Sequence, residues 1–189
     1  SNIITDITVP EYKKIEKISL RNKLNLKTIG VGKGDLNIIT HEYVAEKQVI
    51  KIKYKNNFYY FKTNLIGKIQ IKNLLMAMIA AEKSNIDFKN IVNVISKVNS
   101  VSGRLEKIGR IRNNSKVILD YAHTPDALKT CLQNLKDQFK NNKISIVFGC
   151  GGDRDKFKRP RMGQIVNQFC NKIYLTDDNP RKENPKKIR

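Results

Sequence analysis

The hydrophobic pattern of the first part of the chain predicts strands. β-Branched and aromatic residues alternate partly with polar ones, which is typical of strands with one buried face, over residues 28–31, 35–44, 48–54 and 58–65. Turn-forming residues separate these segments, at Gly32-Lys33-Gly34-Asp35 and at Asn56-Asn57. We therefore expect a strand-rich region here.

The pattern then changes to a helical period. Leu74, Leu75, Met78 and Ile79 recur at helical spacing and predict a helix over residues 69–83. A second helix is expected to begin at Asp87, because a carboxylate at that position can cap its first turn. The small and polar residues 99–103 then indicate a linker.

Beyond the linker, short apolar segments alternate with helical ones. Strands are expected at residues 117–119, 144–148 and 173–175, and helices at 126–139 and 162–169. Continuous apolar strands that alternate with helices are typical of a parallel sheet covered on both faces. We expect the three strands to share one such sheet, so the fold class is α/β.

Charged residues gather directly after each of these strands, in residues 120–125, 149–156 and 177–181. Ligands of parallel α/β sheets bind beyond the carboxyl ends of the strands, so this half is the candidate functional half. The glycines of the second segment allow close backbone approach to a ligand, and its helix entry favours an anion. A solvated turn whose alternating charges pair among themselves is the alternative explanation of that segment.

The composition limits the partners that we expect. The net charge is +20, from 37 Lys and Arg against 17 Asp and Glu, and such a charge attracts polyanions. The lysines are scattered, however, and no RNP-type aromatic motif or zinc finger accompanies them, so a nucleic-acid partner is not expected. Cys131, Cys150 and Cys170 lack CxxC spacing, which favours reduced thiols in a cytoplasmic protein and no metal site. No apolar run is long enough to cross a membrane.

Several motifs occur in order along the chain: SGRLE from Ser102, DYAHTPDAL from Asp120, FGCGGDRDKFKRPRMG from Phe148 and TDDNPR from Thr176. Together they resemble the Mur ligase family, over roughly residues 65–189. The resemblance implies that residues 1–101 are the C-terminal part of the central ATP-binding domain. It also implies that residues 102–189 are most of a Rossmann-like C-terminal domain, which presents the incoming amino acid.

Within the family, the motifs are most similar to those of members that add meso-diaminopimelate to a UDP-N-acetylmuramoyl-dipeptide during peptidoglycan synthesis. The resemblance implies that Asp178, Asn179, Pro180 and Arg181 recognise diaminopimelate and that Arg154 also contacts it. The chemistry agrees, because a guanidinium binds a carboxylate through two charge-assisted hydrogen bonds and lysine lacks the distal carboxylate. A surface arginine after a proline turn is the alternative for position 181.

The resemblance also implies ATP contacts. Asn73 matches a residue that meets the adenine, Arg104 and Asp120 match positions near the adenosine, and His123 lies toward the phosphates. Gln70 stands where the family usually has asparagine. From the residues alone, Asn73 is an ordinary polar residue near a helix N-terminus.

Parts of the family pattern have no counterpart among these residues. The glycine-rich phosphate-binding loop is absent, since the residues from Gly30 to Asp35 lack its spacing and its hydroxyl, and we expect a hairpin turn there. The magnesium ligands, the modified catalytic lysine and the UDP-sugar domain are absent as well. We therefore expect a truncated chain, with no catalytic or metal-binding residues of its own, that is inactive in isolation although the full enzyme uses ATP and Mg²⁺. The final residues, 185–189, resemble the opening turn of a helix.

The expected partners are small molecules: the UDP-N-acetylmuramoyl-dipeptide, meso-diaminopimelate and ATP. We expect a cytoplasmic monomer without membrane contact. Two alternatives stay open, a folylpolyglutamate-synthetase-like ligase and a catalytically dead basic binding module. The DNPR sequence from Asp178 argues against the first, and only the charge supports the second.

Overall fold

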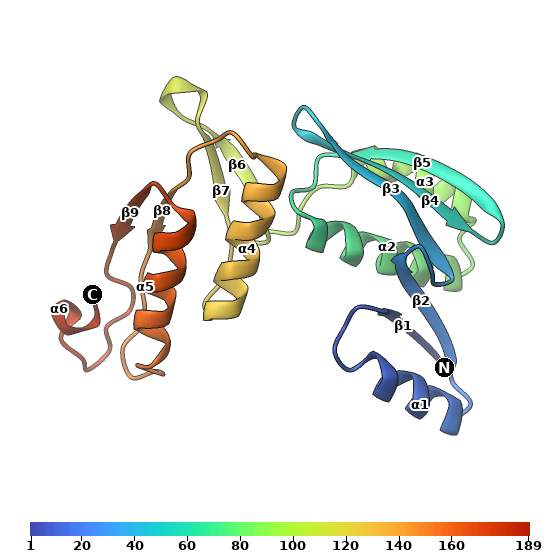
Figure 1. Ribbon diagram of the computed structural model, residues 1–189, viewed down its shortest axis with the longest axis horizontal. Helices are drawn as coiled ribbons and strands as arrows, with labels where there is room; N and C mark the ends of the chain where they lie inside the picture. The colour runs from blue at the N-terminus through green and yellow to red at the C-terminus, as the bar shows by residue number, and fades with distance from the viewer. The chain divides into compact units, whose positions relative to one another are not determined.

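The computed structural model describes residues 1–189, and these form two compact units, Ser1–Ser100 and Val101–Arg189 (Figure 1). Each unit has its own cluster of buried hydrophobic residues. The mixed α/β class that the hydrophobic pattern predicts is confirmed. No helix is both long enough and apolar enough to span a membrane.

The first unit is built on a five-stranded sheet with the strand order β1-β2-β3-β4-β5. The strands are β1 (Asn2–Asp6), β2 (Asn25–Val31), β3 (Leu36–Val44), β4 (Lys47–Tyr54) and β5 (Asn57–Thr63). Strands β2 to β5 confirm the four predicted segments. The sequence analysis did not identify β1 or helix α1 (Tyr12–Arg21), which connects β1 to its parallel neighbour β2.

Two helices cover one face of this sheet. Helix α2 (Lys68–Lys83) confirms the predicted helix, and α3 (Phe88–Val94) begins after Asp87, whose side chain accepts a hydrogen bond from Asn90 N at 3.0 Å. Leu75 and Ile79 of α2 are fully buried against the sheet residues Ile50 and Ile52. A short 3-10 helix (Ile95–Lys97) continues from α3.

The turn between β2 and β3 is not the predicted hairpin. The two strands pair in parallel, with Ile29 opposite Leu36, so the chain doubles back over the end of β2 before β3 begins. Gly32 and Gly34 have φ values of 74° and 103°, which glycine adopts without steric cost. The Asp35 carboxylate accepts hydrogen bonds from Thr28 N at 2.9 Å and Thr28 Oγ1 at 2.8 Å, and these bonds fix the start of β3 beside β2.

From β7 onward the second unit alternates strands and helices as predicted, but the sequence analysis did not identify β6, the strand before it. Its elements are β6 (Glu106–Arg110), β7 (Lys116–Leu119), α4 (Pro125–Gln138), β8 (Ser145–Phe148), α5 (Lys158–Phe169), β9 (Lys172–Leu175) and α6 (Pro185–Ile188), with a 3-10 turn at Arg112–Asn114. Thr124 caps the start of α4, because its hydroxyl accepts a hydrogen bond from Ala127 N, and Pro125 follows in the first turn. The predicted opening turn of a helix at the end of the chain is α6.

The prediction that three strands share one parallel sheet is only partly correct. Strands β8 and β9 are parallel neighbours, but β7 forms a separate antiparallel pair with β6. The apolar faces of this unit are buried mainly through the helices, since Leu128 and Leu132 of α4 and Met162 and Val166 of α5 form its core. Strand pairing is set by contacts that are distant in sequence, so the apolar run of β7 does not specify whether its partner is β6 or β8.

Candidate functional site

Three loops follow the carboxyl ends of β7, β8 and β9, as expected from the motifs. They cover residues 120–124, 149–157 and 176–184. The first is joined to the start of α5 by Lys158 Nζ, which donates to the carbonyl oxygen of His123 at 2.8 Å. The second and third are joined by hydrogen bonds and ion pairs described below. Residues far apart in sequence thus meet where α/β sheets bind ligands.

Arg104 and His123 both lie against the ring of Tyr121. The Arg104 guanidinium lies 5.2 Å from the centre of the Tyr121 ring, and the His123 ring meets Tyr121 edge-on at 5.3 Å. Tyr121 is 66% exposed, so the group forms an open platform of cationic and aromatic side chains. The sequence analysis did not single out Tyr121, although it lies inside the DYAHTP motif.

Asp120 has a clear structural role. One carboxylate oxygen accepts from Leu105 N at 2.9 Å and the other accepts from Ala122 N at 2.9 Å. Leu105 has a φ of 46°, an unusual value that this hydrogen bond helps to hold. Each carboxylate oxygen keeps a second lone pair, so Asp120 retains the capacity to accept a ribose hydroxyl.

Asn73 belongs to the first unit, where it is exposed on α2. Its neighbour Lys72 is anchored, because its ammonium pairs with Asp6 at 2.5 Å and donates to Thr8 Oγ1 at 2.7 Å. The approach to α2 is also fixed. The fully buried Gln48 donates to the carbonyl oxygens of Leu65 at 2.7 Å and Gly67 at 3.2 Å, just before the helix.

The glycines of the 149–157 loop face the neighbouring loop, not an open ligand cradle. A Cβ added to Gly152 would lie 1.9 Å from the carbonyl oxygen of Pro180, and one added to Gly149 would lie 2.5 Å from that of Thr176. The Gly152 amide donates to the carbonyl oxygen of Asn179 at 2.9 Å. The close approach that glycine permits at these positions therefore serves loop-to-loop packing.

The predicted diaminopimelate residues lie on these two loops. Arg154 is exposed on the loop after β8. Asp178, Asn179, Pro180 and Arg181 lie on the loop after β9. The Arg181 guanidinium contacts the loop after β8, where its Nη1 donates to the carbonyl oxygen of Gly152 at 2.7 Å. The structure thus brings the chain segments of both predicted arginines together.

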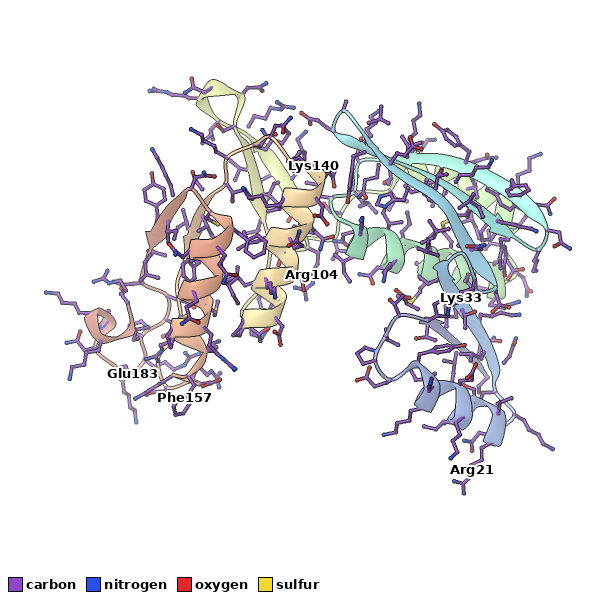
Figure 2. All side chains as sticks on the ribbon, in the orientation of Figure 1. Arg21, Lys33, Arg104, Lys140, Phe157 and Glu183 are labelled. Carbon is purple, nitrogen blue, oxygen red and sulfur yellow. The ribbon has the colours of Figure 1, made fainter.

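Glu183 is the residue of this region that sequence reasoning missed. It lies at the same end of the second unit as Phe157, where α5 begins (Figure 2). The Arg159 guanidinium, the Asp153 amide and the Lys156 ammonium surround its carboxylate and lower the pKa of Glu183 to about 2. An acidic residue two positions after Arg181, in a chain of high positive charge, was the available signal. Within the 149–157 loop, the charged side chain of Lys156 therefore pairs with Glu183 of the other loop.

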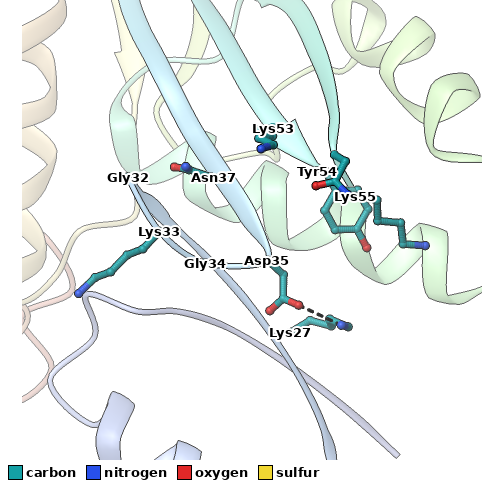
Figure 3. A pocket seen from close by; sticks show the side chains of 10 residues that line it. Lys27, Gly32, Lys33, Gly34, Asp35, Asn37, Lys53, Tyr54 and Lys55 are labelled. Atoms are coloured by element: carbon teal, nitrogen blue, oxygen red, sulfur yellow. Dashed lines mark hydrogen bonds and ion pairs between the residues drawn. The ribbon is translucent and has the colours of Figure 1, made fainter.

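A basic pocket of about 430 Å³ lies in the first unit beside the 32–35 turn (Figure 3). Its lysines are Lys27, Lys33, Lys53 and Lys55. Lys27 pairs with Asp35 at 2.9 Å and Lys55 pairs with Glu82, so part of this positive charge is neutralised. The turn leads into strand β3, whereas a nucleotide phosphate-binding loop leads into a helix, so the resemblance of its glycines to such a loop is superficial.

The three cysteines are free thiols. Burial raises the pKa of Cys131 to about 12, and it also raises the pKa of Cys150 and of Cys170. Because thiolates are the reactive form, none of the three is poised for nucleophilic chemistry near neutral pH.

Comparison with known proteins agrees with the loops and the fold of the second unit. Residues 103–189 match the family described as Mur ligase, glutamate ligase domain. Residues 103–189, which make up nearly all of the second unit, are therefore similar to the glutamate ligase domain of Mur ligases.

A particular member of the family is similar over most of the chain. The chain is 42% identical over 172 residues to the UDP-N-acetylmuramoyl-L-alanyl-D-glutamate--2,6-diaminopimelate ligase of Rickettsia felis, a match that covers 90% of this chain and 32% of that protein. A solved structure of a ligase of the same name shares 30% sequence identity and has a TM-score of 0.67. The match covers all of this chain and 39% of the ligase chain. The chain thus spans about a third of the length of such relatives.

A solved structure of folylpolyglutamate synthetase from Lactobacillus casei superposes with a TM-score of 0.69 and shares 16% sequence identity. The match covers 96% of this chain and 46% of the synthetase chain. This likeness shows a shared fold alone.

Proposed function

We propose that this chain is part of an ATP-dependent ligase that joins meso-2,6-diaminopimelate to UDP-N-acetylmuramoyl-L-alanyl-D-glutamate. The observation that carries the proposal is the 42% identity, over 90% of the chain, with a ligase of that name. The two joined loops after β8 and β9 support it, because they bring together the segments that carry the two arginines expected to recognise the amino acid.

We propose that Arg181 and Arg154 bind the carboxylates of diaminopimelate. A guanidinium fork is suited to a carboxylate, and two such groups on adjoining loops suit a substrate with carboxylates at both ends. Asp178 and Asn179 offer a carboxylate and an amide on the same loop as Arg181. Pro180 limits the directions that this loop can take.

The nucleotide contacts are proposed for Asn73, Arg104, Asp120 and His123. The open platform around Tyr121 suits a flat base or a sugar, and the spare lone pairs of Asp120 suit ribose hydroxyls. Magnesium would accompany ATP in the whole enzyme. No group of three or more His, Cys, Asp or Glu side chains gathers in the structure, and we assign no magnesium ligand to this chain.

The proposed reaction divides the work between parts of the enzyme. A carboxylate oxygen of D-glutamate bonds to the γ-phosphorus of ATP while the bond from that phosphorus to the β-phosphate oxygen breaks, which gives an acyl phosphate and ADP. The neutral amine of diaminopimelate then forms the new C–N bond, while the C–O bond to phosphate breaks and the nitrogen loses a proton. The residues of this chain would hold the amino acid so that its amine faces the acyl phosphate. Because the precursor and ATP are cytoplasmic metabolites, we place the reaction in the cytoplasm.

A ligation assay with the full-length gene product tests this proposal. Purified protein, ATP, Mg²⁺ and the UDP-linked dipeptide are supplied with diaminopimelate, lysine or glutamate, and the product is identified by its mass. Diaminopimelate should be the amino acid that is joined. Transfer of glutamate to a folate acceptor would instead favour a folylpolyglutamate-synthetase-like ligase. Tight, salt-dependent binding of duplex DNA without any ligation would favour a basic binding module.

A further inference from the structure

The carboxylate of Glu183, on the loop after β9, binds groups of the loop after β8 and of the start of α5. Arg159 Nη1 donates to Glu183 Oε2 at 3.0 Å, and Arg159 Nη2 donates to Glu183 Oε1 at 2.9 Å. The Asp153 amide donates to Oε1 at 2.6 Å, and Lys156 Nζ lies 3.5 Å from Oε2. The paired side chains of Arg159 and Glu183 are only 12% and 15% exposed, so water has little access to the fork.

Further hydrogen bonds run between the same two loops. Arg159 Nη2 also donates to the carbonyl oxygen of Gly151 at 3.2 Å, so one guanidinium holds both loops. In the other direction, the Lys182 amide donates to Asp153 Oδ2 at 3.2 Å. The ion pair is therefore the centre of a network and not an isolated surface contact.

The residues held by this network are the immediate neighbours of the two proposed substrate arginines. Asp153 precedes Arg154, and Lys182 follows Arg181. Asp153 and Arg181 both have a φ of 49°, in the left-handed region that disfavours residues other than glycine. Such conformations persist only where the surrounding contacts hold them, and for Asp153 the contacts are those to Glu183 and Lys182.

We propose that Glu183 and Arg159 are positioning residues for the amino-acid site, which set the placement of Arg154 and Arg181 without touching the substrate themselves. This inference rests on the proposed function. Its physical reason is that a guanidinium fork recognises a carboxylate only in the right orientation, and two exposed loops do not maintain such an orientation unaided.

The test compares Glu183→Gln and Arg159→Lys with the unchanged full-length gene product in the ligation assay. Glutamine keeps an acceptor for the Asp153 amide but loses the charge, and lysine keeps the charge but loses the fork. We expect the KM for diaminopimelate to rise about tenfold to a hundredfold in each, because a small misplacement of positioning groups has effects of that order. The kcat at saturating diaminopimelate and the KM for ATP should change less than about threefold.

Asp137→Asn is the matched control. It is also a carboxylate-to-amide change in the second unit, on α4, and asparagine keeps an acceptor for Gln133 Nε2, which donates to Asp137 at 2.8 Å. This variant should leave the KM for diaminopimelate unchanged.

Amide hydrogen exchange on the same proteins separates positioning from general stability. In Glu183→Gln the amides of Gly152, Asp153 and Lys182 should exchange faster, while those of α4 keep their protection. An unchanged KM for diaminopimelate in both variants would overturn the inference, as would equal loss of protection in α4. A parent protein that does not ligate diaminopimelate would overturn the proposed function, and the exchange pattern would still decide whether the pair holds the loops.

Discussion

At the scale of single residues, several charged side chains of the second unit form hydrogen bonds with the backbone. Both oxygens of Asp120 accept amide hydrogens, and one nitrogen of Arg181 donates to the carbonyl oxygen of Gly152. Side chains committed in this way are already ordered before a substrate arrives. Ordering them in advance lowers the entropy cost of binding, so structural and substrate-binding roles in one residue are compatible.

Arg181→Ala in the full-length gene product should raise the KM for diaminopimelate. Removing one half of a desolvated charge pair costs about 2–5 kcal/mol. Because Arg181 is exposed here, we expect the low end, about 2 kcal/mol, which is a rise of roughly thirtyfold. The KM for ATP should change much less, and lysine, which has no distal carboxylate, should lose little. If diaminopimelate and lysine suffered equally in steady-state kinetics, Arg181 would be structural.

Glu183 should make the stability of the second unit depend on pH in the acid range. Its pKa is about 2 in the folded protein against an ordinary value of 4.5, so the folded state favours the charged carboxylate. The stabilisation is therefore fully present above pH 4.5 and is lost as the pH falls toward 2. Urea unfolding of the parent and of Glu183→Gln should show a difference at pH 7 that shrinks between pH 4.5 and 2. A difference that did not change with pH would contradict this assignment.

At the scale of elements, the glycines after β8 decide how two loops pack. The three nearest atoms to a Cβ placed on Gly152 all belong to the backbone of Pro180, which has little freedom to move. Gly163 lies in the middle of α5, where an added Cβ would meet nothing within 4 Å. The same residue type is thus required at one position and replaceable at the other.

Gly152→Ala should destabilise the second unit, and Gly163→Ala should not. Forcing an extra methyl into a closed contact typically costs about 1–3 kcal/mol. Alanine at the helical position should stabilise by roughly 0.5–1 kcal/mol, because glycine has the lower helix propensity. Urea midpoints of the two variants measure both effects. Equal midpoints would mean that the two loops separate easily.

At the scale of the whole molecule, the chain contains two units with separate cores, and the candidate residues are divided between them. Asn73 lies in the first unit, and the other candidate residues lie in the second. The phosphate-binding loop of the family has no counterpart in these 189 residues. A glycine-rich backbone cradle for the β- and γ-phosphates of ATP is therefore not among these residues.

The isolated 189-residue chain should show no diaminopimelate-dependent hydrolysis of ATP. The physical reason is that phosphoryl transfer needs groups that hold the terminal phosphates and neutralise their charge. Phosphate release measured with purified chain, ATP, Mg²⁺ and both other substrates should stay at background. Turnover above background that Asp120→Ala abolishes would refute this expectation.

The sequence by itself determined most of the elements, although not β1, α1 or β6, and it determined the place of the candidate site. Local periodicity identified β2 to β5 and β7 to β9 and all of the longer helices except α1, because side-chain spacing depends on the local chain alone. The motifs also located the loops after β7, β8 and β9. Whether Arg154 and Arg181 bind diaminopimelate stays a prediction.

Only the tertiary structure decided which segments pair with one another. The parallel pairing of β2 with β3 depends on Asp35 reaching Thr28, and the antiparallel partner of β7 could not be read from its own four residues. Glu183 meets Arg159 across 24 residues of sequence, through folding of the whole second unit. Strand pairing and ion pairs of this kind are non-local, so no pattern within one segment specifies them.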